Sequence, residues 1–239
     1  LLDGNKEYVA TIKLGVSTTT YDKTGEVVAV CGVDITSNDI IHTVKSFLGT
    51  QIQLPPIYSA LKFNGKPLYY YARNGIEVEI KSREVEFIKL ELVELISHDE
   101  FKLKIECSKG TYIRSLAHDI GQKLGCGAHL IALKRTKSNK FMLDENITLE
   151  YLEGLNQSER EALLLPIDVL VGDLPSINLD VNQYSKIKFG NQFENNSTFY
   201  SNEYLKAYFE EHFLGIVKPI SSKMFQPVRL INSVLPNTE

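Results

Sequence analysis

Hydrophobic and polar residues alternate along several stretches of the chain, with the period of two that predicts β-strands. The alternation is clearest over residues 8–14 and 101–107. Three further runs, 26–30, 85–95 and 213–217, are rich in Val, Phe, Ile and Leu, and they predict additional strands. The pattern therefore predicts a protein with a large β component.

A spacing of three to four residues between hydrophobic positions predicts helices between these strands. The first predicted helix has Ser37 as its N-cap and Gly49 just past its end. The second begins at the Lys66-Pro67 pair and stops at Gly75, because proline suits the first helical turn and glycine the position after the last. Both helices are expected to pack against the strands.

A third predicted helix follows a turn at residues 108–111 and buries a hydrophobic stripe that includes Ile113 and Leu116. Tyr112 and Arg114 lie off this stripe, at the helix start. We therefore expect their side chains to reach a cleft.

The character of the sequence changes towards its C-terminal part. Two helical segments carry N-terminal signals, a Thr148 N-cap and a capping box over residues 158–161. From about Leu174 the chain consists of short runs with many Asn and Ser residues. We predict two domains, 1–173 and 174–239, of which the second is small and mostly β.

Composition favours an ordinary globular protein. Of the 239 residues, 43% are hydrophobic and 23% charged, close to globular averages. No run approaches the roughly 20 apolar residues of a membrane span, and no export signal opens the chain, so we expect a cytoplasmic protein without membrane contact. Cys126 and His129 have a ligand-like spacing but lack a second such pair, so no metal is predicted.

Charge is distributed unevenly along the chain. The net charge is −4, yet residues 101–140 hold nine Lys and Arg against two acidic residues, 9 − 2 = +7, which leaves −11 for the remainder. A concentrated positive stretch on an acidic body is typical of a face that follows a phosphate backbone. A solvated lysine-rich surface is the alternative.

Four motifs occur in order along the chain. They are K-E-Y…L-G at 6–15, S-A-L-K-x-x-G…Y-x-x-A-R-x-G at 59–75, C-S-K-G-T-Y-I-R at 107–114 and L-G-C-G-A-H at 124–129. Together they resemble the signature of the TruB family of pseudouridine synthases, and the resemblance covers residues 1–168.

The resemblance implies an isomerase that converts the uridine at position 55, in the T loop of tRNA, to pseudouridine without a cofactor. The enzymes of this family detach the uracil, rotate it and rejoin it through carbon. The implied fold is α+β: a pseudouridine-synthase fold with a long mixed, largely antiparallel sheet and flanking helices, followed by a small PUA-like β domain. The short, Asn-rich C-terminal part departs from the family pattern, which leaves its contact with tRNA open.

The family's nucleophilic aspartate lies in a G-x-L-D-P-x-A-T-G segment ahead of the K-x-Y strand. The chain holds no such segment. We expect the complete protein to supply this residue ahead of residue 1. A competing hypothesis follows from the same observation, namely a non-catalytic RNA-binding or tRNA-folding module that keeps the cleft and the basic face.

The resemblance also assigns roles to particular residues. Arg114 is the ion-pair partner that keeps the nucleophile ionised, because a neighbouring guanidinium lowers the pKa of a carboxylic acid. Tyr8 stacks on the flipped base and relays a proton. Tyr112 and Leu133 line the same pocket, and Asp22 matches an acidic position near it.

Four basic residues are interpreted as contacts to RNA phosphates, which position RNA without reading its sequence: Lys62, Lys109, Lys134 and Arg135. The expected partner is the T-arm stem-loop of tRNA, recognised through its shape. We expect the protein to act as a monomer.

Overall fold

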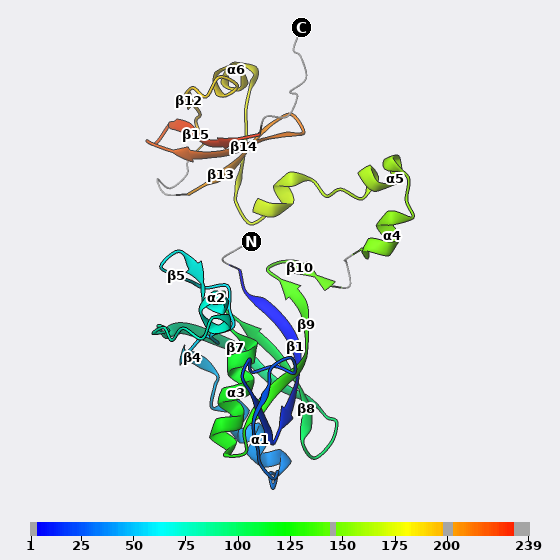
Figure 1. The fold of residues 1–239 in the computed structure, drawn as a ribbon. Coiled ribbons are helices and arrows are strands. Elements are labelled where there is room, and N and C mark those ends of the chain that lie inside the picture. Colours follow the sequence, from blue (N-terminus) through cyan, green and yellow to red (C-terminus); the bar gives the residue numbers. More distant parts are fainter. Residues whose placement is uncertain (1–3, 144–146, 198–202, 232–239) are drawn as a thin grey trace. The chain divides into compact units, whose positions relative to one another are not determined.

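The structure is a computed structural model that describes residues 4–143, 147–197 and 203–231. The chain forms two compact units, Leu1–Ile147 and Thr148–Glu239 (Figure 1). The two units divide at residues 147/148, earlier in the sequence than the boundary at 173/174 that the change in composition predicted. Contacts explain the difference, because the 3-10 helix η2 (Ile167–Val171) packs on the second unit, where the Tyr208 hydroxyl donates a hydrogen bond to the Asp168 carboxylate.

The first unit is built on a six-stranded sheet. Its strands are β1 (Lys6–Leu14), β4 (Gly49–Gln53), β7 (Arg83–Leu95), β8 (Glu100–Cys107), β9 (Ala128–Ser138) and β10 (Phe141–Met142). They follow the order β10-β9-β1-β8-β7-β4, and every neighbouring pair is antiparallel. The strand that begins the chain therefore lies inside the sheet, between β8 and β9.

The period-two pattern accounts for the two central strands. Ala10, Ile12 and Leu14 of β1 are buried, as are the alternate positions of β8 from Phe101 to Cys107. Successive side chains of a strand point to opposite faces. Tyr8 therefore shares the face of Ala10 and stands at the end of its hydrophobic row.

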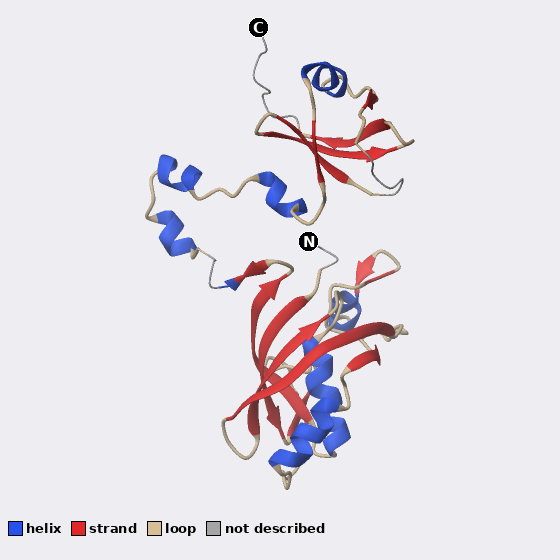
Figure 2. Cartoon of the chain, turned by 180° about the vertical axis from the view of Figure 1, so that it is seen from behind, coloured by secondary structure: helices blue, strands red, loops and turns tan. Residues whose placement is uncertain are grey.

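Helices cover the hydrophobic face of this sheet, as Figure 2 shows for α1 (Ser37–Lys45) and α3 (Ile113–Leu124). The α3 helix contacts β1, β9 and α1, and its buried face includes Leu116 and Ile120. The N-cap of α1 is Thr36, in a capping box with Asp39, and not Ser37 as predicted. The helix also ends well before Gly49, which begins β4.

Gly121 of α3 lies directly against the backbone at the start of β9. A Cβ atom at this position would lie 2.1 Å from the backbone N of Ala128 and 2.3 Å from the carbonyl C of Gly127. We expect Gly121→Ala to lower the free energy of unfolding by roughly 1–3 kcal/mol, the usual cost of overpacking. Urea denaturation measures this, with Gly32→Ala as control because no atom lies within 4 Å of its added Cβ. Equal stability of the two variants would contradict the packing.

Two short hairpins and one short helix complete the first unit. They are β2 (Val16–Thr18) with β3 (Val27–Val30), β5 (Lys62–Phe63) with β6 (Lys66–Pro67), and α2 (Leu68–Arg73). Lys66 and Pro67, which were predicted to begin the helix, instead form strand β6, and helix α2 begins at the next residue, Leu68. Gly75, at φ 64°, does lie just past its end.

The second unit is a small β domain with its own core. Its sheet consists of β11 (Ser176–Asn178), β12 (Phe193–Glu194), β13 (Leu205–Phe209), β14 (His212–Pro219) and β15 (Met224–Leu230), in the order β11-β13-β14-β15-β12. The β11–β13 pair is parallel and the others are antiparallel. Its helix α6 (Val181–Ile187) was not predicted.

Helices α4 (Leu149–Glu153) and α5 (Gln157–Ala162) precede this domain. Thr148 caps α4 as predicted. The predicted capping box over residues 158–161 is wrong, because Asn156 and Glu159 form it instead. No helix of the described part is long and apolar enough to cross a membrane.

The α+β class with a largely antiparallel sheet and a small C-terminal β domain is confirmed.

Candidate active site

Arg114 is the second residue of α3, and its guanidinium is fixed by three acceptors. Its Nη1 donates to the Asp22 carboxylate at 3.0 Å and to the carbonyl oxygen of Thr20 at 3.2 Å. Its Nη2 donates to the carbonyl oxygen of Tyr58 at 2.8 Å. A cation is unfavourable at a helix N-terminus, where the helix dipole is positive, so these acceptors offset an intrinsically poor placement.

Asp22 belongs to the loop between β2 and β3, and hydrogen bonds within that loop fix its carboxylate. Its Oδ1 accepts hydrogen bonds from the Thr20 hydroxyl at 2.7 Å, the Thr24 hydroxyl at 2.6 Å and the Thr24 N–H at 3.0 Å. Burial raises the pKa of the Asp22 carboxyl, but these bonds and the charge of Arg114 outweigh it and lower the pKa below its usual value. The carboxylate is therefore ionised at neutral pH.

Tyr8 lies opposite Ile105 of β8 and Arg135 of β9, beside an irregularity in the β1–β9 register. The residue is half-buried. Burial, with a smaller contribution from Cys107, raises the pKa of the Tyr8 phenol despite the hydrogen bond with Arg135. The phenol therefore stays protonated at neutral pH and is available as a donor.

Tyr112 is the N-cap residue of α3, and the buried side chain of Gln53 fixes its backbone. The Tyr112 N–H donates to Gln53 Oε1 at 2.8 Å, and Gln53 Nε2 donates to the Tyr112 carbonyl at 3.1 Å. The guanidinium of Arg83 lies 5.9 Å from the centre of the Tyr112 ring. Gln53 and Arg83 were missed in the sequence, because nothing along the chain indicates that they meet Tyr112.

Leu133 of β9 lies opposite Ala10 of β1. It is 46% exposed, which leaves its side chain open to a bound molecule. Strand β9 links it to the Asp22 loop. The N–H of Leu130 donates to the Tyr21 carbonyl at 3.0 Å, and the N–H of Lys23 donates to the Leu130 carbonyl at 2.9 Å. Within the described residues, however, no hydrogen bond or ion pair joins Tyr8 or Leu133 to Arg114.

The positive stretch at 101–140 is partly neutralised within the sheet. Lys102 pairs with Glu94 of β7 at 2.6 Å, and Lys104 pairs with Glu7 of β1 at 3.1 Å. Lys134 and Arg135 of β9 are exposed and have no carboxylate within 4.0 Å among the described residues. The positive charge left for a ligand therefore lies on β9 more than on β8.

The other two predicted phosphate contacts lie on separate elements. Lys62 is on the β5–β6 hairpin, and Lys109 is in the turn before α3; both side chains are exposed.

Asp119, on α3, has the largest change in pKa among the Asp and Glu residues that the structure describes. Burial raises its pKa from 3.8 to about 6. Because the folded pKa lies above the unfolded one, the folded state is favoured below pH 3.8 and loses this advantage as pH rises through about 6. We expect Asp119→Asn to be more stable by about 1–3 kcal/mol at pH 7, with the gain shrinking towards pH 4. Urea denaturation at both pH values measures this, and a gain independent of pH would contradict it.

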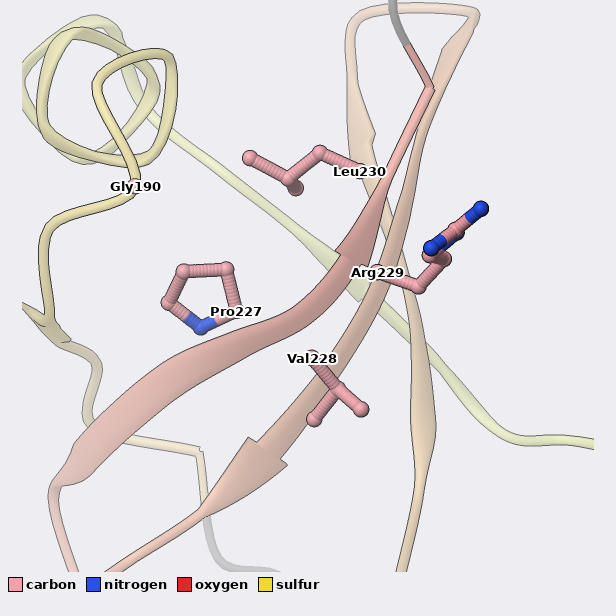
Figure 3. Close-up of a pocket in the computed structure, with 5 residues that line it drawn as sticks. All are labelled: Gly190, Pro227, Val228, Arg229 and Leu230. Carbon is pink, nitrogen blue, oxygen red and sulfur yellow. The ribbon is translucent and has the colours of Figure 1, made fainter.

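A cavity of the second unit lies between Gly190 and residues 227–230 of β15. In Figure 3, Pro227 and Leu230 point towards Gly190, whereas the guanidinium of Arg229 points away. Arg229 is the charged residue among the five described residues that line the cavity. The candidate active site is instead the group around Arg114 and Tyr8 in the first unit.

Two family models together match residues 1–172 of the chain. Residues 1–113 match the model described as TruB family pseudouridylate synthase, N-terminal domain, and residues 114–172 match that of the tRNA pseudouridylate synthase B C-terminal domain.

Curated proteins match over nearly the whole chain. The chain is 41% identical over 234 residues to tRNA pseudouridine synthase B of Aromatoleum aromaticum, covering 98% of this chain and 75% of that relative. It is 42% identical over 235 residues to the tRNA pseudouridine synthase B of Chromobacterium violaceum, covering 97% and 76%.

Two solved structures share the fold at lower identity. A chain in the structure of an H/ACA RNP bound to a substrate RNA containing 2′-deoxyuridine is 21% identical, with a TM-score of 0.64 over 97% of this chain and 67% of that one. A chain of a Cbf5-Nop10-Gar1 complex is 23% identical, with a TM-score of 0.66 and the same coverage. These similarities support the fold.

Proposed function

The chain belongs to the TruB family of pseudouridine synthases, and from this we propose that it isomerises the uridine at position 55, in the T loop of tRNA, to pseudouridine. The reaction breaks the bond from N1 of uracil to C1′ of the ribose and forms a bond from C5 to C1′. The C5 proton leaves and N1 gains a proton, so no oxidant, reductant or cofactor takes part.

The observation that carries the proposal is the fixed guanidinium of Arg114. Its three hydrogen bonds use both Nη1 protons and one Nη2 proton, which leaves Nε–H and one Nη2–H without a partner among the described residues. Two donors of one guanidinium suit a second carboxylate. We assign them to the nucleophilic aspartate, whose ionised form they stabilise.

Asp22 then acts through Arg114. Its carboxylate compensates the positive charge at the start of α3 and orients the guanidinium, while its own hydrogen bonds with Thr20 and Thr24 keep it ionised. It lacks the Pro-x-Ala-Thr-Gly context of the family nucleophile. We therefore give Asp22 a positioning role and not the nucleophilic one.

Tyr8, Tyr112 and Leu133 are proposed to enclose the flipped base. A base taken out of its stack needs new apolar and aromatic surface. The half-buried ring of Tyr8 and the exposed side chain of Leu133 offer such surface on adjacent strands, and the protonated Tyr8 phenol is available for the proton transfer that accompanies rejoining.

The RNA backbone is proposed to contact the four basic residues named above. Lys134 and Arg135 are the principal pair, because they are adjacent and exposed on β9 and no carboxylate of the described residues lies within 4.0 Å of either. Shape readout of the T-arm would then supply specificity. We further propose that the protein works as a monomer in the cytoplasm.

The test is an assay of tritium release from T-arm RNA that contains uridine labelled at C5. The protein should be the product of the whole gene, including any sequence encoded ahead of Leu1. We expect release from the T-arm and none when cytidine replaces the target uridine while label elsewhere in the RNA is retained. Tight RNA binding without release would favour the non-catalytic module instead.

A further inference from the structure

The loop that carries Asp22 is held against α3 at two neighbouring points, and the ion pair is only one of them. Tyr21 stacks on His118, with ring centroids 3.9 Å apart and ring planes 14° apart. His118 follows Arg114 by four residues, a spacing that places both on the same face of a helix. Two consecutive loop residues thus contact two helix residues that lie one turn apart.

Tyr21 adopts a backbone conformation that bulky L residues rarely take. Its φ is 62°, in the left-handed region. The Tyr21 N–H donates to the Thr18 carbonyl at 3.3 Å, and the Tyr21 carbonyl accepts from the N–H of Leu130 at 3.0 Å. Such a conformation persists only where its surroundings hold it. The stacking contact with His118 is one of the interactions that keep Tyr21 in this conformation.

His118 offers its ring face to the loop and not a hydrogen bond. Its Nδ1 is buried and has no hydrogen-bond partner in the described part of the chain. Burial lowers the pKa of His118, and burial together with Asp119 raises the pKa of the Tyr21 phenol, so both rings are neutral at neutral pH. Two neutral rings in parallel contact attract each other beyond the effect of burial alone.

We propose that Tyr21 and His118 are positioning residues, whose stack holds the Asp22 loop so that the Arg114 guanidinium keeps its orientation. Two of the three Arg114 acceptors, the Thr20 carbonyl and the Asp22 carboxylate, flank Tyr21 directly. Loss of the stack lets the loop relax from its left-handed turn and releases both acceptors. The unpaired donors of Arg114 then no longer point in a fixed direction.

The kinetic test rests on the proposed function and uses the product of the whole gene. We expect Tyr21→Ala to lower kcat for tRNA by about tenfold or more, because small misplacements of catalytic groups are costly, with KM nearly unchanged. Tyr21→Phe keeps the ring and should retain activity. Tyr204→Ala, at an exposed tyrosine of the second unit, is the matched control.

A double-mutant cycle separates the stack from unrelated effects. If Tyr21 acts through His118, then Tyr21→Ala combined with His118→Ala should cost no more than the larger single change, since contacting residues are not additive. Additive losses in kcat, or a loss that appears in KM alone, would overturn the proposal.

A second readout needs no activity and so separates this inference from the proposed function. The Nη protons of Arg114 should give separate, slowly exchanging NMR signals in the wild type and in Tyr21→Phe, and merged signals in Tyr21→Ala. His118→Ala covers the case in which Tyr21→Ala does not fold, since it removes the stack and leaves Tyr21 in place; it should also merge the signals. Separate signals in His118→Ala would overturn the proposal, even if no pseudouridine is formed.

Discussion

Arg114→Ala should lower the rate of pseudouridine formation by about 10²–10³-fold or more, with RNA affinity changed little. The structure gives the reason. The guanidinium is fixed by Asp22 and by the carbonyl oxygens of Thr20 and Tyr58, and its two remaining donors have no partner in the described part. Removing it leaves the proposed nucleophile without its counter-charge, while the exposed cations of β9 are untouched. Single-turnover tritium release measures the rate, and filter binding measures the affinity.

Two further variants sharpen this prediction. Arg114→Lys keeps one charge but cannot reach three acceptors and a second carboxylate together, so most of the loss should remain. Arg160→Ala removes an exposed arginine of α5 and should leave the rate unchanged. Near-normal turnover of Arg114→Ala would remove this residue from the catalytic set. Because Arg114 also anchors the Asp22 loop, thermal denaturation must show that the variant is folded.

Charge reversal at two residues of β9, Lys134→Glu combined with Arg135→Glu, should have the largest effect on RNA binding. Both side chains are exposed, and no carboxylate lies within 4.0 Å of either among the described residues. Each phosphate contact releases counterions, so losing two should flatten the slope of log affinity against log salt by about 1.5 and weaken binding roughly tenfold or more at low salt.

The control must change the net charge equally. Lys45→Glu with Lys81→Glu reverses two exposed cations of the first unit at α1 and ahead of β7, outside the basic stretch. This variant should keep the salt slope of the wild type. Equal effects of the two double variants would show that overall charge, and not a contact at β9, sets the affinity.

The spacing of hydrophobic residues predicted the central elements of the fold, because burying one face of a strand or helix imposes that spacing. Strands β1 and β8 follow the alternation of hydrophobic residues, and α3 follows its stripe from Ile113. Signals for helix caps were less reliable where two residues that can cap a helix are adjacent in the sequence. Thr36 caps α1 in place of its neighbour Ser37, because Asp39 then lies at the third helical position and completes a capping box.

Individual residues of the site could be predicted only where they belong to one of the sequence motifs. The pairing of Arg114 with Asp22 was not deduced, since the two residues lie on different elements and only the packing of the β2–β3 loop on α3 joins them. Thr20 and Thr24 hold the Asp22 carboxylate, a contact that the sequence analysis did not predict. The contact of Tyr21 with His118 left no trace in either hydrophobic pattern or motif.

The central claim is that this site isomerises a uridine of tRNA with an aspartate nucleophile. It is tested most directly by tritium release from labelled T-arm RNA, measured for the 239-residue chain and for the product of the whole gene. We predict that both bind the RNA and that the whole gene product releases tritium. Binding by both proteins with release by neither would contradict the account and identify an RNA-binding module.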